Sequence, residues 1–172
     1  MLRFGTDGVR GVALREITPV AVQHFARAAA RALAFPGVVV GHDPRESSDE
    51  LARAVAEGFR AEGLDVVYAG MLPTPAVAFL AATTGRAGAV VTASHNPYTD
   101  NGLKFFRPGG TKLTEADEAA IQSLYEGFVA DHVPFVPPSG NIDAGGGDYV
   151  GHLVSMATDV SPGLRVVVDC AN

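Results

Sequence analysis

Short apolar runs rich in valine alternate with helical segments along most of this chain, and this alternation constrains its fold more than any other feature. The apolar runs lie at residues 38–41, 64–69 and 87–92, and the helical segments around them lie at 18–35, 47–63 and 74–84. Runs of this length and apolarity are typical of strands that are buried on both faces. Such strands, when joined by helices, form a parallel sheet covered by helices. The sequence therefore predicts an α/β fold, a three-layer α/β/α sandwich with a mainly parallel mixed sheet.

The pattern changes after the third apolar run. Residues 103–106 indicate a short antiparallel strand that returns through a turn at 100–102, where Asn-Gly is a turn signal. Thr114 and Asp117 have the spacing of a capping box and predict another helix. We therefore expect the α/β/α domain to occupy residues 1–133.

Three further segments are predicted after this domain. Residues 134–147 are rich in Pro, Ser, Asn and Gly, which indicates a linker or a surface loop. Residues 148–163 are expected to hold a connecting helix, and residues 164–172 another apolar strand with no following helix to cover it. We interpret this strand as the first strand of a truncated second domain.

The composition excludes several kinds of protein. The 172 residues include 13 Lys and Arg against 19 Asp and Glu, a net charge of −6, without a basic cluster. Nucleic acids and anionic membranes are bound by neutralising phosphates, so neither is an expected partner. A single cysteine excludes an intrachain disulfide, and no run approaches the roughly 18 apolar residues of a membrane span. Because the chain also starts without a secretion signal, we expect a soluble, cytoplasmic protein.

Polar segments at 5–11, 41–45 and 92–97 lie at or beside the predicted carboxyl ends of the strands, where α/β sheets bind ligands. Ser94 follows the third apolar run directly, so a loop can present its hydroxyl to a cleft. His95 is its neighbour, but successive residues of an extended chain point to opposite sides, which makes His95 a poor base for Ser94.

Simpler interpretations stay open at this point. Ser94 and Asn96 are ordinary turn residues that can satisfy backbone groups. Arg10 and Lys104 can equally be exposed surface cations.

Three motifs together resemble a known family. Residues 4–11 (FGTDGVRG), 92–97 (TASHNP) and 100–106 (DNGLKFF) are similar to the first domain of the α-D-phosphohexomutases. The similarity extends over essentially the whole chain, and the residues of these motifs are most similar to those of the bacterial glucosamine branch. Ser47 and Ser48 are a departure, since this pair is typical of other branches.

The resemblance implies that Ser94 carries a phosphoryl group and donates it to the free hydroxyl of a hexose phosphate. The bisphosphate intermediate then turns over in the cleft, and the serine takes back the other phosphoryl group. In the glucosamine branch this isomerase reaction of amino sugar biosynthesis interconverts glucosamine 6-phosphate and glucosamine 1-phosphate. The alternatives are phosphomannomutase/phosphoglucomutase activity, or a non-catalytic module that only binds phosphosugars.

The resemblance also implies further catalytic residues. Lys104, Arg10 and His95 match family positions near the donor serine. Lys104 is the expected general acid/base, because burial beside Arg10 would favour a neutral amine whereas a guanidinium stays charged.

Substrate-binding roles are implied for Thr6 and Asn96, with Thr6 expected to hydrogen-bond near the donor serine. Asp43 and Arg45 are interpreted as an ion pair that braces the cleft rather than as catalysts.

Cofactors and partners follow from the same resemblance. One Mg²⁺ is expected, with the phosphoryl oxygen of Ser94 as a ligand and the others in an acidic loop of a second domain that this chain lacks. A sugar 1,6-bisphosphate is expected as activator and intermediate. The other domains of the same enzyme are expected partners, so this fragment is predicted to be inactive alone, and a homodimer is left open.

Overall fold

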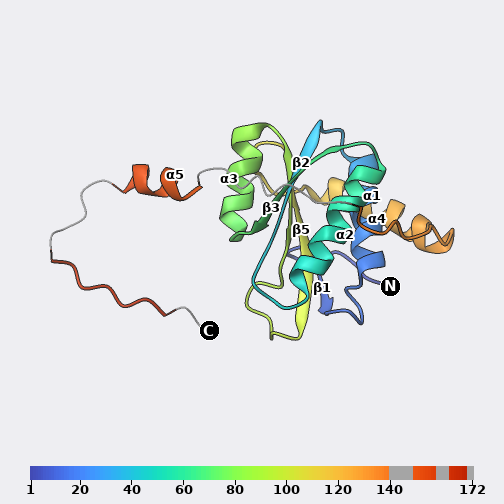
Figure 1. Cartoon of the computed structure of the whole chain (residues 1–172). Helices are drawn as coiled ribbons and strands as arrows, with labels where there is room; N and C mark the ends of the chain where they lie inside the picture. The colour runs from blue at the N-terminus through green and yellow to red at the C-terminus, as the bar shows by residue number, and fades with distance from the viewer. Residues whose placement is uncertain (140–148, 158–162, 170–172) are drawn as a thin grey trace.

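A five-stranded sheet forms the centre of the computed structural model, which describes residues 1–139, 149–157 and 163–169 (Figure 1). The strand order is β1-β5-β4-β2-β3. The strands are β1 (Val9–Val12), β2 (Gly37–His42), β3 (Asp65–Met71), β4 (Ala87–Val91) and β5 (Asp100–Phe106). β2 is parallel to β3 and β4, whereas β5 is antiparallel to both β4 and β1. The predicted mixed, mainly parallel sheet and its antiparallel strand are confirmed.

Helices cover both faces of the sheet, which completes the predicted three layers (Figure 1). One face carries α1 (Pro19–Ala32), α2 (Ser48–Ala61) and α4 (Glu115–Ala130), and the other carries α3 (Thr74–Thr84). Along β2, Val38 and Val40 face the larger core, while Val39 faces the core under α3. This burial on both faces explains why the strand is a continuous apolar run.

Threonine side chains cap the starts of two helices. The Thr18 hydroxyl accepts a hydrogen bond from the Ala21 N–H at the start of α1, and Thr114 and Asp117 form the expected capping box of α4. Thr74 is the first residue of α3 and follows Pro73.

The N-terminal edge of the sheet differs from the sequence prediction. β1 was not predicted, because its four residues become a strand only by pairing with residues 100–103, far away in the chain. The turn predicted at 100–102 is wrong, since these residues are the first part of β5. The chain reverses in the loop between β4 and β5 instead, and Asn101 is fully buried.

The predicted linker begins as part of the folded domain. The Gln23 side chain on α1 donates to the Val136 carbonyl at 2.7 Å and accepts from the Val136 N–H at 2.8 Å. Glu57 on α2 accepts from the Ser139 N–H at 3.3 Å. The domain therefore extends to at least residue 139, and residues 140–147 lie outside the described residues.

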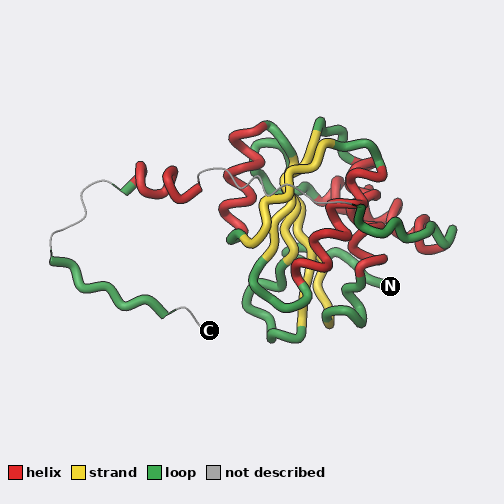
Figure 2. The backbone as a smooth tube through the Cα atoms, in the orientation of Figure 1, coloured by secondary structure: helices red, strands yellow, loops and turns green. Residues whose placement is uncertain are grey.

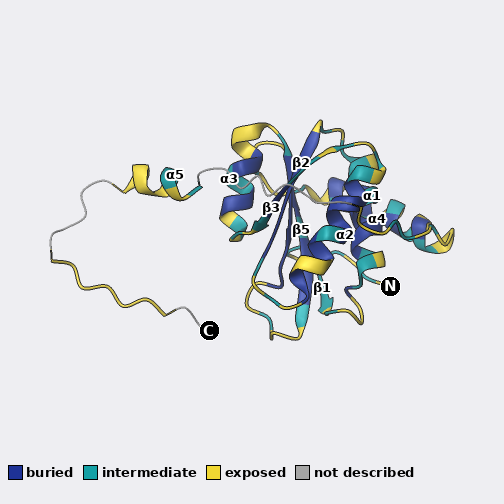
Figure 3. Cartoon of the chain, in the orientation of Figure 1, coloured by how far each residue is buried: buried dark blue, intermediate teal, exposed yellow. Residues whose placement is uncertain are grey.

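The predicted connecting helix is present as α5 (Tyr149–Met156), which contacts α3 through stacked rings of His152 and Phe79, 4.1 Å apart. Residues 164–169 have no regular secondary structure, and Val167 is 95% exposed (Figures 2 and 3). The strand of a second domain therefore stays a prediction, and residues 170–172 lie outside the described residues. Among the described residues, no helix combines the length and apolarity needed to cross a membrane.

Gly102 gives a direct test of the packing between β1 and β5. A Cβ at this position would lie 2.5 Å from the Val9 carbonyl oxygen and 2.9 Å from that of Thr92. We expect Gly102→Ala to lower the free energy of unfolding by about 1–3 kcal/mol, the usual cost of overpacking.

Urea denaturation measures this change, and Gly127→Ala is the matched control. Gly127 lies in α4 with no atom within 4 Å of the added methyl group, so alanine should stabilise the helix by up to about 1 kcal/mol. Equal unfolding midpoints for the two variants would contradict the packing described here.

Candidate functional site

Ser94 lies on the loop after β4, and the residue is exposed. Its φ angle is 58°, in the left-handed region that residues other than glycine rarely adopt. Its N–H donates to the Thr92 hydroxyl at 2.9 Å, which ties the loop to the end of the strand. The sequence therefore placed the exposed serine correctly at the carboxyl end of a buried strand.

His95 differs from its predicted orientation. Its Nδ1 lies 3.4 Å from the Ser94 Oγ, although the two side chains were expected to point to opposite sides. The expectation was wrong because Ser94 is no longer in the extended strand, and its positive φ turns the chain. The distance is nevertheless longer than the roughly 2.6–3.2 Å over which a side chain transfers a proton.

The predicted ion pair of Asp43 and Arg45 is present, with 2.9 Å between Asp43 Oδ2 and Arg45 Nε. Asp43 also accepts hydrogen bonds from the Ser48 hydroxyl at 2.6 Å and the Thr92 hydroxyl at 2.7 Å. Burial alone would raise the pKa of Asp43, but the hydrogen bonds from Ser48, Thr92 and Arg45 outweigh it and lower this pKa below its ordinary value. Asp43 is therefore a stable anion at the base of the loop that carries Ser94.

Asn101 bonds to both Ser47 and Ser48. Its Nδ2 donates to the hydroxyls of Ser47 and Ser48, each at 2.9 Å, and its Oδ1 accepts from the Gly102 N–H at 2.8 Å. The two serines thus attach β5 to the start of α2, and the Ser47 side chain makes no capping bond to the helix.

A chain of hydrogen bonds links Lys104 to the Ser94 loop. The Lys104 ammonium donates to Asp7 Oδ2, which also accepts from Arg10 Nη2 at 2.9 Å. Arg10 Nη1 donates to Asn96 Oδ1 at 3.1 Å, and Asn96 Nδ2 donates to Asp100 Oδ2 at 3.0 Å. The structure therefore joins Arg10, Asn96 and Lys104, but within the described residues Lys104 reaches the loop only through Asp7 and Arg10.

Asp7 is a site residue that the sequence reasoning missed. The hydrogen bond from Lys104 lowers the pKa of Asp7, burial opposes this effect, and the charges of Lys112 and Arg10 add to it. The sequence argument for Lys104 considered burial and Arg10 but not this carboxylate, with which Lys104 forms an ion pair. The signal in the sequence that could have indicated Asp7 is its position, three residues before Arg10.

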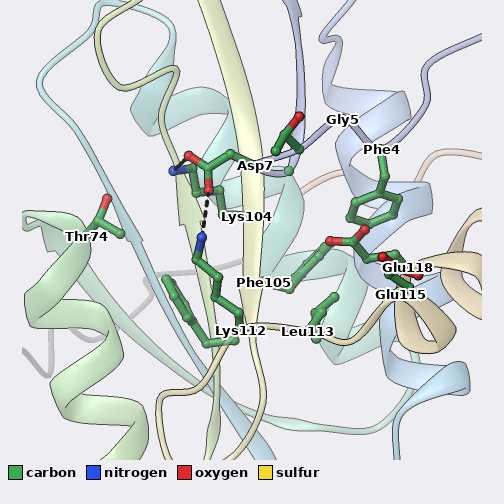
Figure 4. A pocket seen from close by; sticks show the side chains of 13 residues that line it. Phe4, Gly5, Asp7, Thr74, Lys104, Phe105, Lys112, Leu113, Glu115 and Glu118 are labelled. Carbon is green, nitrogen blue, oxygen red and sulfur yellow. Dashed lines mark hydrogen bonds and ion pairs between the residues drawn. The ribbon is translucent and has the colours of Figure 1, made fainter.

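A pocket of about 460 Å³ lies beside Lys104 (Figure 4). Figure 4 shows Asp7 between the side chains of Lys104 and Lys112, and Thr74 at the start of α3 lies across the pocket. Thr6 lines the same pocket, and no hydrogen bond between described residues joins it to the donor loop. Residues 94–96 do not line the pocket, so the predicted residues form two neighbouring parts of one site.

The described residues do not form a complete metal site. Nowhere in this part of the chain do three His, Cys, Asp or Glu side chains gather as a metal cluster requires. Mg²⁺ normally takes six oxygen ligands, several of them water. The one ligand expected in this chain, the phosphoryl oxygen of Ser94, stays a prediction.

Comparison with protein families gives a match over residues 1–128 to phosphoglucomutase/phosphomannomutase, alpha/beta/alpha domain I. A phosphoglucosamine mutase from Rhodococcus erythropolis is 43% identical, over 98% of this chain and 40% of its own length. One from Mycobacterium leprae is 44% identical, over 98% of this chain and 38% of its own length. The chain thus spans about 40% of the length of these curated relatives.

A solved structure gives the same result. A phosphoglucomutase/phosphomannomutase family protein from Burkholderia thailandensis superposes with a TM-score of 0.62 and is 35% identical. The match covers 75% of this chain and 30% of that protein.

The lowered pKa of Asp43 predicts how stability depends on pH. A carboxyl group whose pKa is lower in the folded state stabilises the fold above its unfolded pKa of about 3.9, and this contribution disappears as pH falls through the folded value. We expect Asp43→Asn to lower the free energy of unfolding by about 1–3 kcal/mol at pH 7. This difference in stability between the variant and the natural protein should become smaller below pH of about 4.

Thermal or urea unfolding between pH 3 and 7 measures this gap. Asp131→Asn at the exposed end of α4 is the control and should change the stability little at any pH. A gap for Asp43→Asn that is constant over this range would show that its charge is not the cause.

Proposed function

This chain belongs to the phosphoglucomutase/phosphomannomutase family, and we propose that it is the domain of a phosphohexomutase that carries the phosphoryl donor, Ser94. The observation that carries the proposal is the exposed Ser94 hydroxyl on a loop fixed at both ends and linked to Arg10 and Lys104. The chain spans about 40% of the length of its relatives. In this proposal the domain acts together with the other domains of the enzyme and is inactive alone.

Glucosamine phosphates are the proposed substrates. Relatives at 43% and 44% identity are named phosphoglucosamine mutase, which favours interconversion of glucosamine 6-phosphate and glucosamine 1-phosphate. The Ser47–Ser48 pair is the feature that keeps phosphomannomutase/phosphoglucomutase activity as the second candidate. It holds the start of α2 against β5 by bonds to Asn101.

The proposed reaction is a pair of phosphoryl transfers. The free hydroxyl oxygen of the sugar phosphate attacks the phosphorus on Ser94, the bond from phosphorus to Oγ breaks, and Oγ takes a proton while the sugar hydroxyl loses one. The bisphosphate then turns over, the Ser94 Oγ attacks the phosphorus of its other phosphoryl group, the bond from that phosphorus to the sugar oxygen breaks, and the proton transfers reverse. Both steps conserve the phosphoryl group, so they interconvert the two isomers without net hydrolysis.

The chain's own residues supply charge and protons in this scheme. Phosphoryl transfer depends mainly on positioning and charge stabilisation. Arg10 supplies a fixed positive charge beside the loop, and its buried Nε has no hydrogen-bond partner among the described residues, which leaves a donor for a phosphate oxygen. Lys104, which pairs with Asp7, is the proposed proton donor and acceptor.

His95, Asn96 and Thr6 have supporting roles in the proposal. Asn96 fixes the loop through Arg10 and Asp100, while His95 and Thr6 contact the incoming phosphate or sugar. Mg²⁺, when bound to a phosphoryl oxygen of Ser94 and to ligands outside this chain, would neutralise charge on that group, and a sugar 1,6-bisphosphate would load the serine.

Replacement of Ser94 tests the donor assignment. In the complete enzyme, Ser94→Ala should abolish the conversion of glucosamine 6-phosphate, because no hydroxyl remains to carry the phosphoryl group. The conversion is measured with glucosamine, glucose and mannose phosphates in parallel, and intact mass reports a phosphoryl group gained from the 1,6-bisphosphate. Ser94→Thr is the conservative companion, and a Ser94→Ala enzyme that still turns over would disprove the proposal.

Replacement of Lys104 tests proton transfer. Lys104→Ala should lower kcat about a hundredfold or more, and Lys104→Arg should do the same, because a guanidinium keeps the charge without exchanging protons. The dependence of kcat on pH is measured for both variants. Full activity of Lys104→Arg would show that Lys104 contributes charge alone.

A further inference from the structure

We propose that Arg45 is a positioning residue for phosphoryl transfer, whose guanidinium holds the Ser94 loop in the one shape that presents the Ser94 hydroxyl to the substrate. The inference rests on the proposed function of Ser94 and adds a residue that controls the rate from outside the reacting groups. Arg45 then acts on kcat and leaves substrate binding largely unchanged.

The carrying observation is that every N–H of the Arg45 guanidinium has an acceptor at the base of this loop. Nε donates to Asp43 Oδ2 at 2.9 Å. Nη1 donates to the carbonyls of Pro97 at 2.6 Å and Asp100 at 3.1 Å. Nη2 donates to the carbonyls of Ser94 at 3.0 Å and Asn96 at 2.9 Å. A guanidinium has five N–H donors, so every donor of Arg45 is used. Four of the five bonds go to backbone carbonyls of residues 94–100.

Arg45 is itself held firmly. Its side chain is only 12% exposed, and its backbone N–H donates to Asp43 Oδ1 at 3.1 Å. Asp43 is fixed in turn by the hydroxyls of Ser48 on α2 and Thr92 at the end of β4. The guanidinium is therefore held rigidly, because Asp43, its ion-pair partner, is hydrogen-bonded to both a helix and a strand end of the domain.

Ser94 is held by the ion pair from both sides. Its carbonyl accepts from Arg45 Nη2, and its N–H donates to the Thr92 hydroxyl, which itself donates to Asp43. A residue with φ of 58° would relax to an ordinary conformation if these bonds were removed. The strained conformation that exposes the hydroxyl thus depends on Asp43 and Arg45 together.

Lysine cannot replace this arrangement. A lysine at position 45 keeps the charge opposite Asp43, but its ammonium has three donors on one nitrogen and cannot reach four carbonyls spread along the loop. Arg45→Lys therefore separates the positioning effect from the charge, with little risk of unfolding the domain.

The experiment compares Arg45→Lys with the natural sequence in the complete enzyme. We expect kcat for the conversion of glucosamine 6-phosphate to fall about 10–100-fold, the cost of misplacing a reacting group by about 1 Å. KM should change less than about threefold, because the guanidinium donors of Arg45 all bond to the protein itself. Hydrogen exchange of the amides in residues 94–100 should become at least about tenfold faster while the other strands and helices stay protected.

Arg53→Lys is the matched control. Arg53 also pairs with an aspartate at the start of α2, at 2.8 Å from Asp49, but makes no hydrogen bond to the described loop residues. This variant should leave kcat, KM and the loop exchange unchanged.

Two results would overturn the role of Arg45. One is a folded Arg45→Lys enzyme with kcat within about twofold of the natural value and unchanged loop exchange. The other is a rise in KM at constant kcat, which would make Arg45 a binding residue. Turnover by Ser94→Ala would instead remove the proposed function itself, so the two failures are distinguishable.

Discussion

A mostly buried carboxylate must be compensated, and the way Asp43 is compensated determines the arrangement of the whole site. Its two oxygens accept from Ser48, Thr92 and Arg45, which belong to different elements of the fold. Burying this charge without partners would be costly. The bonds therefore fix the ends of β2 and β4 and the start of α2 relative to one another. The shape of the exposed Ser94 loop therefore depends on this largely buried anion.

The sheet could be predicted from the sequence because its central strands are buried on both faces. β2 packs into both cores, with Val38 and Val40 in one and Val39 in the other. The strand is therefore a continuous apolar run that the sequence alone indicates. β1 and the first half of β5 could not be found in this way. β1 has only two apolar residues, Val9 and Val12, and residues 100–102 of β5 are polar or glycine. Asn101 is buried with its hydrogen bonds completed by Ser47 and Ser48 at the start of α2.

The positions of Ser94, Arg10 and Lys104 at the candidate site could be predicted from their motifs, while their roles stay predictions. The site could not be predicted where the fold brings together residues that lie far apart in the chain. Asp7 and Lys104 are 97 positions apart in the chain, and only the pairing of β1 with β5 brings their segments together. The geometry of His95 was missed for a local reason: β4 ends at Val91, and the positive φ of Ser94 turns the chain before His95.

The saturated guanidinium of Arg45 also limits how the loop can vary. Surface loops usually tolerate insertions and deletions, because their backbone groups can bond to water. Here the carbonyls of Ser94, Asn96, Pro97 and Asp100 must each meet a donor whose direction is set by a planar group. One residue more or fewer would leave a largely buried donor without its acceptor. The segment is therefore a loop in its shape, but its length is as strictly determined as that of a strand in the core.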